Sequence, residues 1–201
     1  MNIQLRCAVV AWILLLGSYS GIAQSAEKSG SSRFEVGMAL SGIQFPGTSS
    51  LGLGGRGVLN INSVLSLEAE GNFFLKDAAP SFQSGGRIVE GLFGAKLGYR
   101  GDRVGVFGKV RPGVISFSKV IQNITFDPAN PLAFSIQTGR LTRPALDLGA
   151  VIEVYPAEHW AWRSDLGDTM IFYDSTSLFG IRIPGTRKNN FQFSTGLQYR
   201  F

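Results

Sequence analysis

From residue 33 to the end of the chain, apolar and polar residues alternate with a period of two, the pattern of β-strands that have one apolar and one polar face. Turn-forming residues interrupt the alternation at near-regular intervals. The alternating segments number eight and span residues 33–43, 51–61, 64–74, 87–99, 104–117, 143–154, 160–172 and 191–201. The imperfect join at Arg87 and Ile88 predicts a bulge or the true start of the fourth strand. Pro112 has no amide proton, so we expect a bulge or an end of regular pairing there.

The connections between these segments alternate in length. Tight turns at 62–63, 101–102 and 156–159 alternate with longer segments at 44–50, 75–86, 118–142 and 173–190. An even strand number, with both ends of the chain on the short-turn side, is the wiring of an up-and-down transmembrane barrel. The sequence therefore predicts an all-β fold, an eight-stranded antiparallel up-and-down transmembrane β-barrel over residues 33–201.

The first residues have the composition of a secretory signal peptide. Arg6 supplies a positive charge, and the apolar core Cys7–Gly17 is 11 residues long, whereas a membrane-spanning helix needs about 20. Small residues at Gly21 and Ala23 predict cleavage after Ala23, with Ala26 as a poorer site and an uncleaved anchor as the alternative. Residues 1–23 are thus the expected signal peptide, and 24–32 a short periplasmic segment. The only cysteine is Cys7, so the mature chain has no disulfide or cysteine metal site.

Charged residues on the strands share a phase with one another and oppose the large apolar residues. A barrel in lipid turns the charged face toward its lumen, whereas a soluble barrel would expose it to water. With Arg87 and Arg143 included, eight bases accompany seven acids, and such balance suits a narrow interior in which an unpaired charge costs several kcal/mol. The expected lumen charge network consists of Glu35, Arg56, Glu68, Glu70, Glu90, Lys96, Lys109, Arg111, Asp147, Glu153, Arg163, Asp165 and Arg200.

The C-terminal residues Leu197, Tyr199 and Phe201 alternate with polar residues and end the sequence on an aromatic side chain. This tail resembles the insertion signal of outer-membrane proteins. Further aromatic residues at the short-turn end, Trp160, Trp162 and Tyr99, are typical of an interfacial girdle. In architecture and tail the chain resembles the small outer-membrane β-barrel family typified by the OmpA transmembrane domain and OmpX. That resemblance implies a monomer in the outer membrane of a Gram-negative bacterium, inserted by the barrel-assembly machinery and in contact with membrane lipid and lipopolysaccharide.

Candidate catalytic and metal-binding residues are few. Enzymatic barrels of this environment use a histidine to activate a nucleophile or water. The single histidine, His159, falls in a predicted periplasmic turn, so we expect no enzyme and no cofactor. Asp165, Asp168 and Thr169 suggest either a cation site or, as we favour, a structural role. The glycines of 51–57 are expected to lie in a strand, since no helix follows them as in a phosphate loop. Basic residues are scattered, which argues against nucleic acid as a partner.

The long connections carry the leading functional hypothesis. Apolar residues within 118–142 suggest a hairpin above the membrane, and Arg182, Arg187 and Lys188 could bind lipopolysaccharide phosphates. The sequence thus favours a non-enzymatic barrel with a filled polar lumen that serves envelope structure or binds ligands through its extracellular loops. A narrow pore for ions or small solutes is the alternative. A lipid-modifying enzyme is the third hypothesis.

Overall fold

A computed structural model of the chain describes residues 32–45, 48–78, 81, 84–126, 134–178 and 181–201. They belong to the second of two units into which the chain divides, Ser31–Phe201. The expected signal peptide, residues 1–23, lies outside the described residues, and so does the expected periplasmic segment except for Ser32. Both therefore remain predictions.

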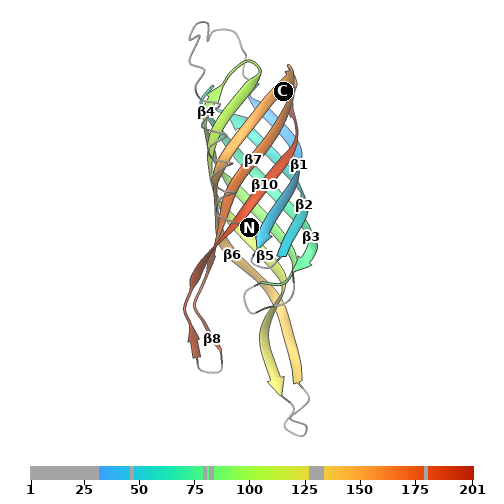
Figure 1. Cartoon of the computed structure of the whole chain (residues 1–201), viewed down its shortest axis with the longest axis vertical. Coiled ribbons are helices and arrows are strands. Elements are labelled where there is room, and N and C mark those ends of the chain that lie inside the picture. The colour runs from blue at the N-terminus through green and yellow to red at the C-terminus, as the bar shows by residue number, and fades with distance from the viewer. Residues whose placement is uncertain (1–31, 46–47, 79–80, 82–83, 127–133, 179–180) are drawn as a thin grey trace, which may run out of the picture. The chain divides into compact units, whose positions relative to one another are not determined.

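Eight strands close into one antiparallel barrel (Figure 1). Their order around the barrel is β1-β10-β7-β6-β5-β4-β3-β2, so each strand pairs with its neighbours in the chain and β1 closes against β10, with Glu35 opposite Arg200. The barrel strands are β1 (Phe34–Phe45), β2 (Thr48–Asn60), β3 (Leu65–Ala78), β4 (Gly86–Arg100), β5 (Val104–Phe126), β6 (Phe134–Ala157), β7 (Trp160–Tyr173) and β10 (Thr186–Arg200). The predicted eight-stranded, up-and-down barrel is confirmed.

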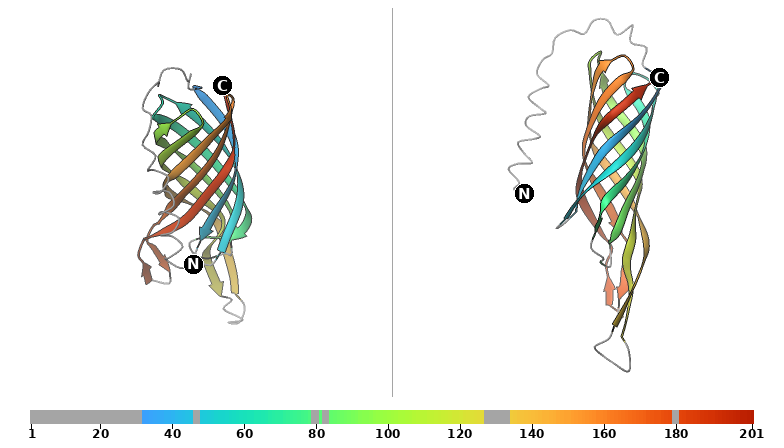
Figure 2. Two further views of the ribbon diagram at one scale, coloured as in Figure 1. Left: turned by 45° about the horizontal axis from the view of Figure 1, so that its top comes forward. Right: turned by 90° about the vertical axis from the view of Figure 1, so that its right-hand side faces the viewer.

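The long connections contain more strand than the alternation predicted. β5 and β6 continue as a paired hairpin beyond the other strands (Figure 2). Two short strands, β8 (Thr176–Leu178) and β9 (Ile181–Ile183), pair with each other at the same end of the barrel. Among the described residues, no helix is both long and apolar enough to cross a membrane.

Two local expectations are settled by the strand register. Of the two outcomes expected at Pro112, the structure shows an interruption of regular pairing: in the β4–β5 ladder Leu92 pairs with Gly113 and Ala95 with Val110, and the pairs between them are skipped. The other outcome, a bulge, does not occur there, because both pairs share one register. The missing amide proton removes local pairing without adding a residue to the strand. The join at Arg87 and Ile88 lies at the start of the strand, because β4 begins at Gly86, and the β3–β4 register shifts there between the pairs Phe74 with Ile88 and Ala78 with Gly86. Ile88 lies in phase with the buried Glu90. Arg87 therefore faces outward, contrary to its expected place in the lumen.

Side chains divide between the two faces of the barrel wall in the reverse of a soluble protein's order. Large apolar side chains on the outer face are exposed, as in Met38 at 76% and Phe93 at 61%. Charged side chains on the inner face are buried, and Lys96 and Glu153 are 0% exposed. At the short-turn end the outer face carries aromatic rings in contact, with Tyr199 5.3 Å from Trp160 and 5.0 Å from Phe201. The expected tail residues thus form an outward aromatic edge; their role as an insertion signal remains a prediction.

Candidate functional site: the barrel lumen and its two ends

The middle of the lumen is organised around the guanidinium group of Arg163. Its Nη1 lies 2.6 Å from Oε2 of Glu68, and its Nη2 lies 2.7 Å from Oδ1 of Asp165. Glu68 comes from β3 on the far side of the barrel, so this ion pair joins opposite walls. Because the Arg163 side chain is completely buried, its charge depends on these carboxylates for compensation.

A second arginine, Arg111, extends the network toward the loop end. It lies 2.5 Å from Glu70 and 2.6 Å from Asp147. Arg56 connects the two arginine centres, since its Nη2 lies 2.5 Å from Glu70 and 2.9 Å from Asp165. Short charge-assisted hydrogen bonds of this kind are the strong ones in proteins. They bind five different strands together through their side chains.

At the short-turn end the network is completed by Arg100, an arginine outside the predicted set. Arg100 lies 3.6 Å from Glu35, as does Arg200, and donates a 2.8 Å hydrogen bond to Asn60. Arg100 is in phase with Lys96, but the predicted strand ended at Tyr99 and left it in a turn. Extending the alternation by one residue would have found it.

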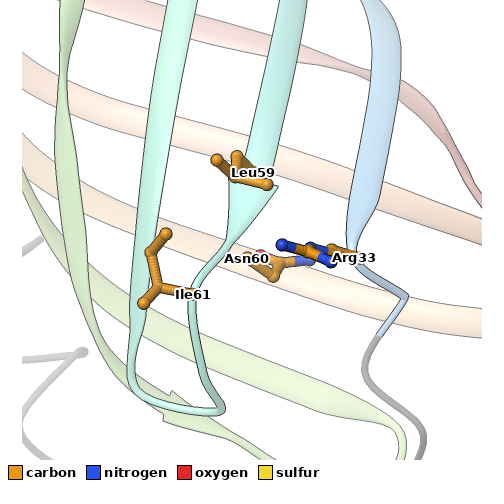
Figure 3. Close-up of a pocket in the computed structure, with 4 residues that line it drawn as sticks. All are labelled: Arg33, Leu59, Asn60 and Ile61. Atoms are coloured by element: carbon orange, nitrogen blue, oxygen red, sulfur yellow. The ribbon is translucent and has the colours of Figure 1, made fainter.

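A shallow pocket of about 340 Å³ lies beside this end of the lumen. Its described lining residues are Arg33, Leu59, Asn60 and Ile61 (Figure 3). The Asn60 amide already donates to Glu35 and to the Ser32 carbonyl. The pocket therefore offers a ligand little beyond the Arg33 guanidinium, and we assign it no function.

The structure places all thirteen residues of the expected network in the buried interior. Twelve form ion pairs there, including Lys96 with Glu153 and Lys109 with Asp147. Arg143, by contrast, pairs at the loop end with the exposed Asp174, at 2.5 Å. With Arg100 counted and Arg87 and Arg143 removed, seven bases accompany seven acids in the lumen.

Glu90, alone among the thirteen residues, forms no ion pair with a side chain that the structure describes. Its Oε2 accepts 2.8 Å hydrogen bonds from Asn72 and Gln192 instead. Ser41 and Thr169 add further hydrogen bonds to these two amides. Neutral polar groups thus form a layer above the ionic one.

Substituting glutamine for Glu90 is therefore expected to change the free energy of unfolding by less than about 1 kcal/mol, because a neutral amide oxygen can accept the same two bonds. Urea unfolding of the folded barrel in lipid vesicles measures this. Glu68→Gln is the matched comparison and should cost clearly more, since it leaves Arg163 with one carboxylate fewer. Equal losses for both variants would show that Glu90 carries an ionic role.

Above the polar layer, the lumen becomes apolar. A buried cluster at the loop end consists of Ile43, Phe74, Ile88, Ile115, Phe117, Val120, Ala145, Ile171 and Tyr173. Phe45 and Leu141 pack against it. The expectation of a wholly polar lumen is thus corrected. The predicted polar lumen did not include these residues, although Ile88 and Phe74 are in phase with Glu90 and Asn72 on their strands.

The other candidate residues are not brought together. Asp165 faces the lumen, whereas Asp168 lies on the opposite face and accepts a hydrogen bond from Asn189 at 2.7 Å. They cannot share a cation, and within the described residues no cluster of metal ligands occurs. The glycine-rich segment lies within β2 as expected, and a Cβ on Gly54 would come within 2.0 Å of the Asn72 side chain. His159 is exposed in its turn, stacked on Tyr199 at 5.8 Å.

The three residues expected to bind at the surface do not form one described patch. Arg187 is exposed on the outer face of β10. Lys188, its neighbour, points to the other face, with Nζ 5.3 Å from the centre of the Tyr173 ring. The side chain of Arg182 lies outside the described residues, although its backbone pairs with Ser177.

The fold and the lumen define a class of protein: a closed barrel with an apolar exterior and a charged, internally paired core. No family model and no curated protein matches the sequence. Among solved structures, the attachment invasion locus protein of Yersinia pestis, in complex with the heparin analogue sucrose octasulfate, matches at a TM-score of 0.49 and 14% identity over 84% of this chain and 96% of that one. Neisserial surface protein A matches at 0.49 and 12% identity, over 86% and 100% of the two chains. The outer membrane protein AlkL matches at 0.43 and 12%, over 90% and 96%.

Proposed function

We propose that this chain is a non-enzymatic outer-membrane β-barrel protein of a Gram-negative bacterium, whose filled lumen is structural and whose loop end serves surface binding or envelope structure. The observation that carries the proposal is the reversal of the two faces. Exposed apolar side chains cover the barrel exterior, while the side chains of seven bases and seven acids are buried inside. In water, so large an exposed apolar surface would promote aggregation. In a bilayer it is required, because lipid contacts the outer face.

A pore function is disfavoured by what fills the lumen. An ion crossing it would meet, in order, the paired charges around Arg163, the amide layer at Glu90 and the apolar cluster at Phe117. An eight-stranded barrel is only wide enough for its own side chains. Displacing them would separate buried ion pairs, at several kcal/mol each.

We therefore expect the mature chain, folded into a planar lipid bilayer, to give no resolvable single-channel conductance steps. Folding is checked on the same preparation by the shift in gel mobility between unheated and boiled samples, with an established porin as the positive control. Reproducible conductance steps from the folded barrel would contradict the proposal and place a pore function first. Failure to fold into lipid at all would contradict the membrane location itself.

A further inference from the structure

A group of basic side chains lies on the outer wall at the loop end, outside the lumen network. Arg87, Lys119 and Arg140 come from β4, β5 and β6, three neighbouring strands. With Phe73, Val89, Ser116 and Ser118 they line a pocket of about 530 Å³. This volume is within the range of small-molecule sites. None of the described residues that line it is acidic.

A β-bulge brings Lys119 to this face. Phe117 pairs with Leu141 and Val120 pairs with Gly139, so Ser118 and Lys119 together lie opposite the single residue Arg140. Without the extra residue, Lys119 would follow Phe117 in phase and enter the apolar part of the lumen. With it, Val120 takes the buried position at 2% exposure and Lys119 is exposed beside Arg140. Bulges commonly redirect a side chain at functional positions.

The start of β4 is held against the same bulge. The Arg87 amide donates to the Ser118 hydroxyl at 2.7 Å, and the Lys119 amide donates to the Gly85 carbonyl at 3.0 Å. Between them Gly86 has a φ of 69°, and a Cβ there would lie 2.8 Å from Cβ of Lys119. Only glycine allows this approach without strain. Arg87 is therefore fixed in one row with Lys119 and Arg140.

The pocket also lies where the apolar exterior gives way to polar residues. Along the outer face of β4, Arg87 is followed by the exposed Val89, Phe93 and Leu97. Along β6, Arg140 and Thr142 precede Leu146 and Leu148 in the same way. One edge of the pocket is thus cationic and the other, at Phe73 and Val89, is continuous with the lipid-facing surface.

We propose that this pocket binds the phosphorylated headgroup of a membrane lipid, with an acyl chain lying on Phe73 and Val89. Arginine matches phosphate oxygens with paired N–H donors, and lysine and hydroxyl groups add further donors. Basic residues at the membrane surface attract anionic headgroups. The inference rests on the proposed membrane location, because in water the apolar edge would face no lipid.

The experiment is native mass spectrometry of the folded barrel in a neutral detergent, titrated separately with phosphatidic acid and phosphatidylcholine. We expect preferential phosphatidic acid adducts, weakened by added salt. The double variant R87Q/R140Q should lower phosphatidic acid affinity about tenfold or more, since it removes two charge-assisted contacts. R33Q/R103Q removes the same charge from exposed positions at the short-turn end and should leave affinity unchanged.

Equal phosphatidic acid binding by R87Q/R140Q and the parent chain would overturn the assignment. Equal binding of the two lipids by the parent chain would do the same, and so would competition by inorganic phosphate without any lipid preference. Gel mobility and planar-bilayer recordings on the same preparations separate this result from the proposed function. A barrel that folds in lipid and stays electrically silent, yet shows no phosphate preference, would refute only the lipid site.

Discussion

Replacing Arg163 with methionine is expected to destabilise the barrel by about 3–5 kcal/mol, the cost typical of removing one partner from a buried ion pair. Methionine fills much of the same volume, so the loss is chiefly electrostatic. Glu68 would lose its 2.6 Å partner and, among the described side chains, keep an ion pair with Arg111 alone, at 3.3 Å. Asp165 would keep Arg56 and Lys109, at 2.9 and 3.4 Å. The remaining contacts place the expected value toward the lower end of the range.

Urea unfolding in lipid vesicles, followed by tryptophan fluorescence, measures this loss. Arg103→Met is the matched control, because Arg103 is exposed in the turn between β4 and β5, and it should change stability by no more than about 0.5 kcal/mol. The double variant R163M/E68Q removes both partners. It should be more stable than the sum of the two single losses predicts, by about 0.5–3 kcal/mol. Additive losses would show that Arg163 and Glu68 are not coupled, and that the lumen is wetter than the ion pairs indicate.

The alternation along the chain was sufficient to predict both the barrel and the contents of its middle section. A period of two assigns every residue of a strand to one face once one residue is placed. Arg163 and Asp165 are two residues apart and therefore lie on the same face, and so do Glu68 and Glu70. Their pairing across the barrel, Arg163 with Glu68, follows from closure because the lumen is narrow.

The same reasoning failed where residue type was used in place of phase. The prediction of a polar lumen did not include Ile88 and Phe74, yet they lie in phase with buried polar neighbours and belong to the apolar cluster. Arg87 was assigned inward because it is charged, although its phase is that of Val89. At the ends of a membrane barrel the rule for each face is reversed. The outer face can carry charged residues because it lies beyond the lipid, and the inner face can carry apolar residues because the lumen still excludes water.

The bulge at Ser118 and Lys119 was beyond the reach of one sequence. It exists because β5 carries one residue more than β6 between two fixed pairs, Phe117 with Leu141 and Val120 with Gly139. Such a difference is defined only by how two strands pair, and the residue pattern of either strand alone does not show it. The basic pocket depends on this bulge, so surface cations were predicted only in the loops, at Arg182, Arg187 and Lys188.

Arginine substituted for Phe93 should distinguish a barrel in lipid from one in water. Phe93 lies on the outer face of β4, midway between Arg87 and Tyr99 in the strand, and so at the expected middle of the bilayer. Phe93→Arg should therefore cost about 2–4 kcal/mol relative to Phe93→Ala, as cations do at the midplane of outer-membrane barrels. Tyr99→Arg, at the aromatic edge, should cost only about 0–1 kcal/mol relative to Tyr99→Ala.

The two positions can be compared directly because the parent side chains, Phe93 and Tyr99, are similarly exposed, at 61% and 72%. In a barrel surrounded by water, arginine at either position would be solvated, and both differences would be within about 0.5 kcal/mol of zero. In a bilayer the cost depends on depth alone, since neither residue contacts the lumen network. Urea unfolding of the four variants in vesicles gives both differences. Equal values at Phe93 and Tyr99 would contradict a membrane-spanning exterior, whatever the lumen contains.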